Sequence, residues 1–473
     1  MDKINKYIQL LYMNLSYGTS GFRYPAVTML SISYNIGQSC CVLSHQKNKP
    51  IGIMITASHN QYTDNGVKII NYDGTMLSQE DEDFMIDSMF KYTTYKELNR
   101  NTTIVIGMDT RESSDSIKQL IIKGIRKIDI NPNIIDLGKV TTPQLHHEVY
   151  KVTNSNYPSY YDAYFSCLTD LEYPHVVVDC ANGVGTFVLQ KIIENYSLHN
   201  NIILHHINTS EYKQLNHKCG SEFIEKHGIS SFCMMDHVLH ASLDGDADRI
   251  ICYYKVKDRF YLLDGDYISA LFAYYFYKRI NITGLRVGVI HTNYANSNFI
   301  DFVHSLGFHT KCTATGVKNL FRAAKHYDVG IYFESNGHGS VVFKDKHIDP
   351  ELASLLNPFI GDGITDLFAI LYVLQELDIS PKQWFNLFHK KAANTYKFVV
   401  KDKTIFKTNA SESRLIQPVK VQNSLDAIME NGYRIFIRPS GTENILRIHV
   451  EAETETELEE AKLLIRNTMR EFI

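Results

Sequence analysis

Short apolar runs recur along the chain, and each is followed by a polar turn and a segment with helical periodicity. The runs lie at residues 51–55, 104–108, 176–179, 287–291 and 329–333. Apolar runs of this length predict buried strands. Strands that alternate with helices are typical of α/β layers, so we expect an α/β fold.

Changes of composition predict four domains. A polar stretch at 151–161 marks the first boundary. The strand–helix unit that begins with the run at 176–179 ends near 264–266. The next unit, which contains the runs at 287–291 and 329–333, ends at a turn formed by Ser380 and Pro381. From about Lys390 onward, separate strands precede an acidic amphipathic helix, which predicts a smaller α+β unit. We expect domains at 1–155, 156–267, 268–385 and 386–473, the first three with α/β architecture.

The composition indicates a globular chain that acts on a small molecule. The 473 residues are 44% hydrophobic, and 52 acidic against 48 basic residues leave a net charge of −4. This balance excludes a strongly basic nucleic-acid footprint and a polybasic membrane patch. We therefore expect a small-molecule substrate, no nucleic acid and no membrane, and the oligomeric state stays open.

The cysteines and the N-terminal residues favour the cytoplasm. Eight cysteines without a C-x-x-C pair fit neither a disulfide framework nor a zinc site, so we expect reduced thiols. The N-terminus lacks the long apolar stretch of a leader peptide, and no later segment has the uncharged apolar length of a membrane span. A cytoplasmic location is the expectation.

The first segment with candidate chemistry directly follows the apolar run at 51–55. It contains Ser58 and His59, and Lys68 follows shortly after. A serine hydroxyl beside an imidazole and a lysine can accept and return a phosphoryl group when the surrounding charges allow it. The alternative is a polar loop in which Ser58 caps the start of a helix.

The second segment places Asp244, Asp246 and Asp248 at alternate positions after another apolar stretch. Three carboxylates in a tight turn can converge on one hard cation. A calcium-binding EF-hand is excluded, because Arg249 occupies the position of its glycine and Lys255 that of its glutamate. We therefore expect Mg²⁺, with a solvated acidic turn as the alternative.

The third segment combines an arginine, two hydroxyls and a glycine near the C-terminus. Its residues are Arg438, Ser440, Gly441 and Thr442, with Arg447 a few positions later. Guanidinium groups, hydroxyls and exposed backbone N–H groups form a cradle for a phosphate-sized anion. The alternative is an ordinary turn between two strands.

The fourth segment follows the run at 329–333 and interleaves polar residues with glycine. Glu334, Asn336 and His338 supply a carboxylate, an amide and an imidazole, which suit recognition of sugar hydroxyl and amide groups. Glycines on either side of His338 would allow a close approach to a ring. The alternative is a glycine-rich polar hairpin.

The order and separation of these four segments resemble the α-D-phosphohexomutase superfamily, and in detail its phosphoacetylglucosamine mutase branch. Further matching segments lie at 17–23, 141–145, 216–220 and 315–318, so the resemblance covers nearly the whole chain. It implies three α/β domains with mixed sheets and a smaller phosphate-binding domain around a central cleft. The chain departs from the usual residues of this superfamily at Gln61, Ser335 and Asn444, and Ser335 lies in the fourth segment, beside Glu334 and Asn336.

The resemblance also implies a role for each candidate residue. Phosphoryl transfer would use Ser58 as the phosphoserine, with Arg23, His59, Lys68, Arg249 and His338 around it. Magnesium would be held by Ser58, Asp244, Asp246 and Asp248. The substrate would contact Thr315, Gly316, Glu334, Asn336, Arg438, Ser440, Gly441, Thr442 and Arg447.

The implied reaction is the interconversion of N-acetylglucosamine 6-phosphate and N-acetylglucosamine 1-phosphate, primed by a hexosamine 1,6-bisphosphate. Its product would supply the biosynthesis of UDP-N-acetylglucosamine. Three alternatives stay open. They are a mutase acting on glucose or mannose phosphates, a metal-dependent phosphatase, and a protein that binds hexose phosphates without catalysis.

Overall fold

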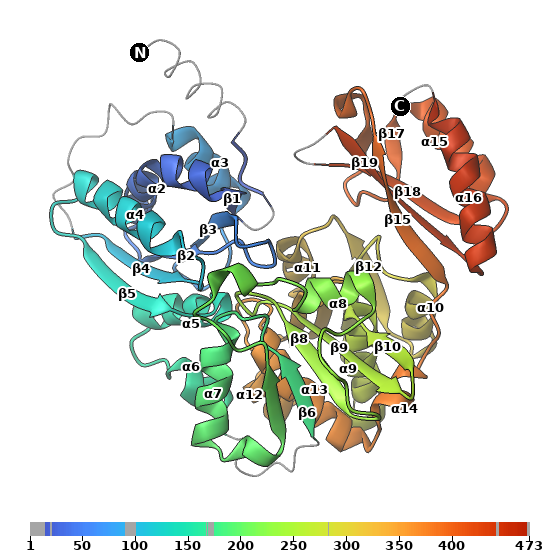
Figure 1. Ribbon diagram of the computed structural model, residues 1–473, viewed down its shortest axis with the longest axis horizontal. Helices are drawn as coiled ribbons and strands as arrows, with labels where there is room; N and C mark the ends of the chain where they lie inside the picture. Colours follow the sequence, from blue (N-terminus) through green and yellow to red (C-terminus); the bar gives the residue numbers. More distant parts are fainter. Residues whose placement is uncertain are drawn as a thin grey trace. The chain divides into compact units, whose positions relative to one another are not determined.

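The computed structural model describes residues 15–18, 21–89, 101–166, 168, 175–281, 283–440 and 444–470. The chain forms two compact units. Figure 1 labels their helices and strands. Unit 1 combines Met1–Leu262 with Asn336–Ser340 and Pro350–Gln375. Unit 2 combines Leu263–Ser335 with Val341–Asp349 and Glu376–Ile473. Each unit is therefore assembled from segments that are far apart in the sequence.

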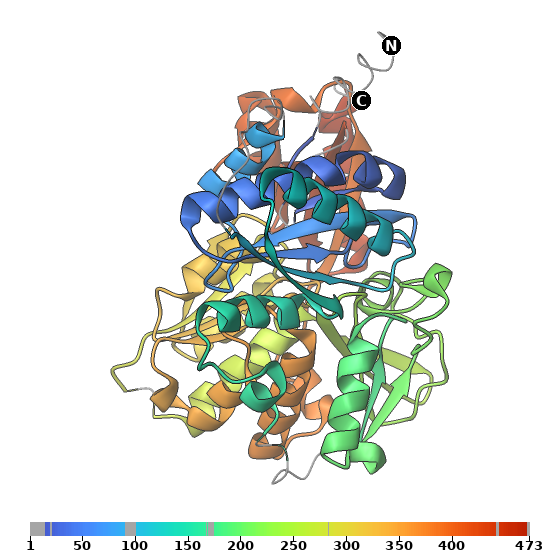
Figure 2. The ribbon, with the colours of Figure 1, turned by 90° about the vertical axis from the view of Figure 1, so that its left-hand side faces the viewer.

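The first sheet of unit 1 has the strand order β1-β3-β2-β4-β5 and is covered on both faces (Figure 2). Its strands are β1 (Phe22–Pro25), β2 (Ile51–Ile55), β3 (Asp64–Ile70), β4 (Thr103–Met108) and β5 (Asn133–Lys139). Strand β2 runs parallel to β4 and antiparallel to β3. Ile53 packs toward the helices of one face and Met54 toward those of the other, as the alternation of a strand requires.

Helices α2 (Ala26–Lys47), α3 (Gln79–Ser88) and α4 (Ser114–Ile128) contribute to the core on one face of this sheet, and α5 (Thr142–Thr153) packs on the other. Among the described residues, α2 is the one helix whose length and hydropathy would suffice to cross a membrane. It packs so closely against α4 that a Cβ on Gly37 would lie 2.1 Å from the Ile121 oxygen. Burial within this domain accounts for its apolar sequence.

The second sheet of unit 1 has the order β10-β9-β8-β6-β7. Its strands are β6 (Val176–Asp179), β7 (Ile202–His205), β8 (Leu239–Leu243), β9 (Ile250–Val256) and β10 (Arg259–Leu263). The accompanying helices are α6 (Tyr160–Tyr164), α7 (Gly185–Asn195), α8 (Ser221–His227), α12 (Pro350–Leu355) and α13 (Gly363–Leu377). Asp362, just before α13, accepts a 2.8 Å hydrogen bond from the buried Tyr160 hydroxyl, which ties the late segment to the early one.

The third sheet has the order β12-β11-β13-β14, with β11 parallel to both β12 and β13. Its strands are β11 (Val287–Thr292), β12 (His309–Thr313), β13 (Val329–Phe333) and β14 (Gly339–Phe343). The helices in this part of the chain are α9 (Gly265–Arg279), α10 (Ser297–Ser305), α11 (Val317–Ala324) and α14 (Pro381–Phe385). Short 3-10 helices occur at Leu198–Asn200, Tyr212–Gln214, Lys346–Ile348 and Lys403–Ile405.

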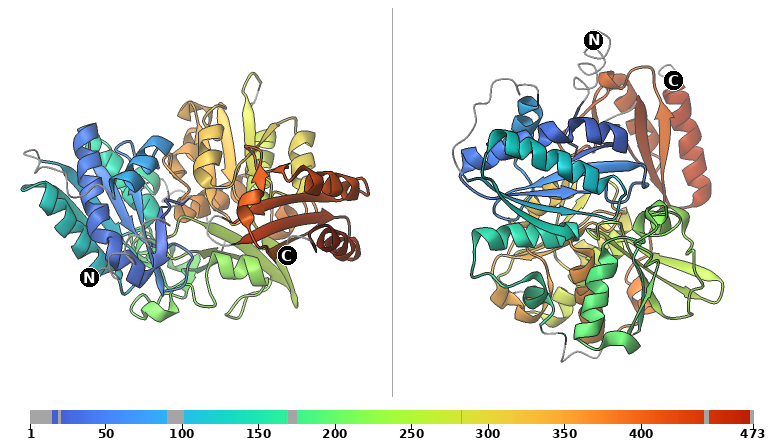
Figure 3. Two further views of the ribbon diagram at one scale, coloured as in Figure 1. Left: turned by 90° about the horizontal axis from the view of Figure 1, so that it is seen from above. Right: turned by 60° about the vertical axis from the view of Figure 1, so that its left-hand side comes forward.

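The C-terminal sheet is antiparallel and has the order β15-β19-β18. Its strands are drawn in orange to red in Figure 3. Its strands are β15 (Ala392–Val399), β18 (Arg434–Pro439) and β19 (Ile445–Ala452), and a separate pair consists of β16 (Lys407–Thr408) and β17 (Leu415–Gln417). Helices α15 (Val419–Met429) and α16 (Glu455–Thr468) share its apolar core. On its other face, the register places Lys397 opposite Arg447 and Arg447 opposite Arg438.

The predicted mixed α/β architecture and all five predicted strands are confirmed. The prediction that each run leads into a helix is wrong for 51–55 and 329–333, because strands β3 and β14 follow as neighbours in the same sheets. In β3, the run of Val67, Ile69 and Ile70 is rich in β-branched residues and completely buried, which suits a strand. The four domain boundaries stay predictions.

Candidate active site

Ser58 lies in the turn that follows β2 and is fully buried. Its backbone φ of 53° lies in the left-handed region, which is uncommon for residues other than glycine. The hydroxyl donates a 2.7 Å hydrogen bond to Asp244 Oδ2 and lies 3.4 Å from His59 Nδ1. Because β3 rather than a helix follows, Ser58 is not a helix cap, and its side chain faces a charged cluster.

A buried ion pair behind the turn holds this serine in place. Arg111 Nη2 donates to the carbonyl oxygens of Ser58 at 2.9 Å and Asn60 at 2.8 Å, and Nη1 donates to those of Gln61 and Asp64 at 2.6 and 2.9 Å. Arg111 Nε donates to Asp109 at 2.9 Å. The guanidinium therefore fixes four carbonyl groups of one loop.

Asn216 adds a second support, since its Nδ2 donates to the carbonyl oxygens of Ser58 at 2.8 Å and Asn60 at 3.1 Å. Asp109, Arg111 and Asn216 were absent from the residues predicted to act at the site. Two sequence signals pointed toward this group: Asp109 directly follows the run at 104–108, and Asn216 begins one of the segments that match the superfamily.

The predicted acidic segment forms the turn between β8 and β9. One carboxylate oxygen from each of Asp244, Asp246 and Asp248 lies within 4.8 Å of the other two, and all three side chains are buried. Lys68 Nζ donates to Asp246 Oδ2 and Asp248 Oδ2, both at 2.6 Å. Thr142 Oγ1 also donates to Asp246 Oδ2, at 2.5 Å. The structure thus joins Ser58, Lys68 and the aspartates.

This donor set fits a magnesium ion. The second oxygens of Asp246 and Asp248 are buried and accept no hydrogen bond from the described part of the chain. Burial, and then the neighbouring Asp248 and Asp246, raise the pKa of Asp244. A divalent cation would compensate this crowding of negative charge with the all-oxygen ligands that magnesium prefers.

Two arginines add positive charge on the same side. Arg249 Nε lies 3.7 Å from both Asp244 Oδ2 and Asp248 Oδ1. Arg23 Nη1 donates a 3.2 Å hydrogen bond to Asn60. Burial and then the charge of Arg249 lower the pKa of Arg23. A buried and a partly buried guanidinium group that repel each other indicate a place for an anion.

The two predicted histidines are neutral around pH 7. Burial, and then the charges of Arg249 and Arg23, hold the pKa of His59 well below its usual range. Burial lowers the pKa of His338 to about 4. His59 Nε2 lies 3.2 Å from Glu222 Oε2. Neutral imidazoles are suited to accept a proton from a hydroxyl.

The tip of the β13–β14 hairpin carries Asn336 and His338 into unit 1. Gly337 has a φ of 79°, and a Cβ there would lie 1.8 Å from the Ile250 oxygen. The Ile250 backbone N–H donates to the Gly337 oxygen at 3.1 Å. This contact fixes the hairpin tip on the strand that follows the aspartate turn.

Unit 1 also contains a cavity of about 670 Å³ beside the serine loop. Its lining includes His59, Asn60, Lys218, Glu222 and Lys226. Because His59 lines it, the cavity gives a small polar ligand access to the imidazole that neighbours Ser58.

The remaining predicted residues lie in unit 2. Glu334 Oε1 accepts a 2.9 Å hydrogen bond from the Gly316 N–H. Thr315 donates to Glu412 Oε2 through its N–H at 3.0 Å and its hydroxyl at 2.7 Å. Arg438 Nε donates to the other oxygen of Glu412 at 2.9 Å. Sequence reasoning missed Glu412, which lies in a polar segment without a motif.

The anion cradle predicted near the C-terminus belongs to the β18–β19 connection. Arg438 and Arg447 are directly paired across these strands, and Ser440 is buried with its N–H bonded to the Ile445 oxygen at 2.8 Å. Like charges at paired positions destabilise a sheet unless an anion lies between them. Gly441 and Thr442 lie outside the described residues, so their predicted contacts stay predictions.

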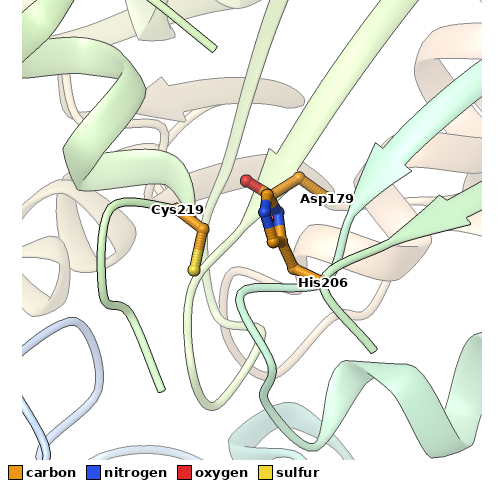
Figure 4. Close-up of side chains that lie close together, drawn as sticks. All are labelled: Asp179, His206 and Cys219. Atoms are coloured by element: carbon orange, nitrogen blue, oxygen red, sulfur yellow. The ribbon is translucent and has the colours of Figure 1, made fainter. Parts of the chain in front are cut away.

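A second cluster with metal-binding residue types consists of Asp179, His206 and Cys219 (Figure 4). Asp179 already accepts four hydrogen bonds, from His206 Nδ1, Ser242 Oγ and the N–H groups of Ala181 and Gly220. Burial raises the pKa of Cys219, which keeps it a thiol. The cluster is a hydrogen-bonded anchor for the segment that carries Asn216.

Three protein-family models match the chain. "Phosphoglucomutase/phosphomannomutase, alpha/beta/alpha domain I" matches residues 38–96 and 85–157. "Phosphoacetylglucosamine mutase AMG1, domain III" matches 264–351, and "Phosphoglucomutase/phosphomannomutase, C-terminal domain" matches 396–467. The matched regions include the serine turn, the residues from Thr315 to Asn336, and the anion cradle.

Several known proteins are similar to this chain over nearly its whole length. The chain is 34% identical to the phosphoacetylglucosamine mutase of Candida albicans, over 95% of each chain. A structure of Aspergillus fumigatus N-acetylphosphoglucosamine mutase with GlcNAc-6P and magnesium superposes with a TM-score of 0.88, at 28% identity, over 96% of this chain and 95% of that one. The structure of a variant of that enzyme with glucose 1,6-bisphosphate superposes with a TM-score of 0.87, at 28% identity, over 97% of this chain and 95% of that one.

Proposed function

The chain belongs to the phosphoacetylglucosamine mutase family of the α-D-phosphohexomutase superfamily, and we propose that it works through a phosphorylated Ser58. Like its curated relatives, it is a mutase that interconverts N-acetylglucosamine 6-phosphate and N-acetylglucosamine 1-phosphate. The observation that carries the proposed route is the buried Ser58 hydroxyl, 2.7 Å from Asp244 in a cluster of three carboxylates.

Asp244, Asp246, Asp248 and the Ser58 oxygen would hold the magnesium ion. The bound ion would neutralise charge on the transferring phosphoryl group. Lys68 keeps Asp246 and Asp248 at fixed positions, because its Nζ contacts both carboxylates at 2.6 Å. The chain thus supplies a preformed set of oxygen ligands.

Arg23 and Arg249 would bind the phosphoryl oxygens, since their guanidinium groups lie against Asn60 and Asp244, which flank Ser58. His59 would take the proton of the Ser58 hydroxyl when the serine attacks, and return it when the serine leaves. Its Nδ1 is 3.4 Å from Ser58 Oγ, and its low pKa keeps it neutral. His338 would serve the sugar hydroxyl in the same way.

The remaining predicted residues would bind the sugar and the phosphate that does not react. Glu334 and Asn336 would contact the hexosamine, and the cradle at Arg438, Ser440 and Arg447 would hold the phosphate. A hexosamine 1,6-bisphosphate would form as the intermediate and must reorient before Ser58 recovers a phosphoryl group. The cradle must therefore accept either phosphate.

The setting proposed for this reaction is the cytoplasm, with a product that supplies UDP-N-acetylglucosamine synthesis. The described cysteines are free and mostly buried, which suits a reducing compartment. A mutase that prefers glucose or mannose phosphates is the second candidate, because two of the matching family models are shared with those enzymes.

The test is conversion of N-acetylglucosamine 6-phosphate followed by ³¹P NMR, with Mg²⁺ and catalytic bisphosphate. Glucose 6-phosphate is included as a competing substrate. The native chain is compared with Ser58→Ala, and with Ser166→Ala as an exposed-serine control. Loss of turnover in Ser58→Ala alone supports the phosphoserine route, and equal turnover would refute it. Preferential use of glucose 6-phosphate would reassign the substrate.

A further inference from the structure

Glu412 connects two loops that the proposed function places on opposite ends of the substrate. It lies between β16 and β17 with a backbone φ of 58°, and its side chain is 23% exposed. One carboxylate oxygen accepts from Arg438 Nε at 2.9 Å. The other accepts from the Thr315 N–H at 3.0 Å and from its hydroxyl at 2.7 Å.

The connection continues as far as the sugar-binding glutamate. Gly316, next to Thr315, donates its N–H to Glu334 Oε1 at 2.9 Å. The loop that carries Glu412 is itself attached to the strand end after β11, because Asn293 Nδ2 donates to the Ser411 oxygen at 2.6 Å. Arg438, Glu412, Thr315 and Glu334 thus form one continuous chain of contacts inside unit 2.

The charges around Arg438 show that Glu412 does not simply neutralise the cradle. Lys397, Arg447 and Arg438 occupy paired positions across β15, β19 and β18, so this row brings three cations together. Glu412 contacts Arg438 through Nε. The carboxylate therefore orients the guanidinium, and the row keeps a surplus of positive charge for a phosphate dianion.

We propose that Glu412 is a positioning residue that sets the spacing between the phosphate cradle and the sugar-binding loop. The inference rests on the proposed function, which assigns the phosphate to Arg438 and the sugar to Glu334. The non-reacting phosphate is bound alike in the ground state and the transition state. Removal of Glu412 should therefore raise KM and leave kcat nearly unchanged.

The contacts of Glu412 with Arg438 and Thr315 also predict that its removal weakens the discrimination between sugars. When Arg438 loses its fixed orientation, a phosphate can shift in the cradle and the hexosamine can shift against Glu334. The ratio of kcat/KM for N-acetylglucosamine 6-phosphate over glucose 6-phosphate should therefore fall. A residue that only stabilised the loop would lower active protein without changing this ratio.

The test compares Glu412→Gln with Glu430→Gln, an exposed glutamate of the same domain. In Glu412→Gln, the amide can keep the bond from Thr315 but presents a donor to Arg438 Nε. We expect KM for N-acetylglucosamine 6-phosphate to rise about 10-fold, equivalent to about 1.4 kcal/mol, with kcat within about twofold. Glu430→Gln should match the native chain in both constants.

A second variant keeps the test decisive if Glu412→Gln folds poorly. Thr315→Val removes the hydroxyl that donates to Glu412 and should raise KM about threefold. In the double variant with Glu412→Ala, KM should be no higher than in Glu412→Ala alone. An unchanged KM in Glu412→Gln, or additive effects in the double variant, would overturn the positioning role. Absence of mutase activity in the native chain would instead refute the proposed function.

Discussion

Ser58 Oγ and Asp244 Oδ2 are joined by a 2.7 Å hydrogen bond across 186 positions of sequence. The serine belongs to the first sheet of unit 1 and the aspartate to the second, so the bond fixes the nucleophile on the acidic turn. A phosphoryl group on Ser58 would lie near the turn that Lys68 and Arg249 contact. The predictions below follow from this arrangement and its supports.

Removal of Lys68 should destabilise the metal-free chain. In Lys68→Met, the carboxylates of Asp246 and Asp248 lose the cation that contacts both at 2.6 Å. Breaking a buried pair from one side costs about 3 kcal/mol. Urea unfolding with a chelator should show this loss, and Mg²⁺ should reduce it. Lys47→Met, which breaks a more exposed ion pair with Asp81, serves as the control.

Chelation should abolish turnover, and added Mg²⁺ should restore it. Binding to the aspartate turn also stabilises the folded chain, by about 2.7 kcal/mol at a concentration 100 times the Kd. Thermal unfolding should therefore shift upward with Mg²⁺ in the native chain. The same shift in a variant combining Asp246→Asn with Asp248→Asn would place the ion elsewhere.

Arg111→Lys should slow catalysis, although the substitution keeps a positive charge at this position. A lysine cannot replace a guanidinium that donates to four carbonyl groups of the Ser58 loop. A displacement of the nucleophile of about 1 Å is sufficient to lower kcat about 100-fold. The measurement is kcat from steady-state kinetics, with Arg126→Lys on the exposed end of α4 as the matched control.

Gly337→Ala should lower both stability and kcat/KM. A methyl group there would lie 1.8 Å from the Ile250 oxygen and move the hairpin that carries His338. Gly284→Ala is the matched control, because Gly284 has a φ of 81° but no atom within 4 Å of its added Cβ. Both variants should pay the conformational cost of a positive φ, about 1 kcal/mol, and only Gly337→Ala should lose activity.

Acid should destabilise the C-terminal domain through His449. Burial, and then the charges of Arg434 and Lys390, lower the pKa of His449 to about 3, and its Nδ1 contacts the Thr395 hydroxyl at 3.0 Å. The unfolded state binds the proton more readily, since its pKa is about 6.5. Stability is therefore complete above about pH 6.5 and declines toward pH 3, by up to about 1.4 kcal/mol per pH unit.

The measurement is urea unfolding of the native chain and of His449→Gln at pH 7 and pH 5. An amide of similar size keeps a polar partner for Thr395 but cannot titrate. The variant should lose less stability between the two pH values than the native chain. Equal losses would show that other groups control the acid response.

Local sequence signals predicted the parts of the site that lie within one turn. Asp244, Asp246 and Asp248 repel one another unless a cation joins them, so their spacing alone indicated a metal. Ser58 stood out because a polar turn follows an apolar strand. The same local reasoning failed for β3 and β14, since an apolar run does not specify whether the next element pairs with it or packs on it.

The supports of the site could not be read from the sequence. Arg111 acts on carbonyl groups up to 53 positions away, and backbone carbonyl groups carry no sequence signature. Glu412 contacts Thr315 across 97 positions, in a segment without a motif. Such pairs are created when distant segments of one unit pack together, so only the folded chain reveals them.

Unit 1 is complete only when Asn336–Ser340 and Pro350–Gln375 have joined Met1–Leu262. During synthesis, Tyr160 is therefore made long before Asp362, the buried partner of its hydroxyl. The acidic turn must also wait for the hairpin tip that carries Gly337. A nascent chain paused after residue 262 would lack α13, so the apolar surface that this buried helix covers in unit 1 would stay exposed until residue 375 had been made.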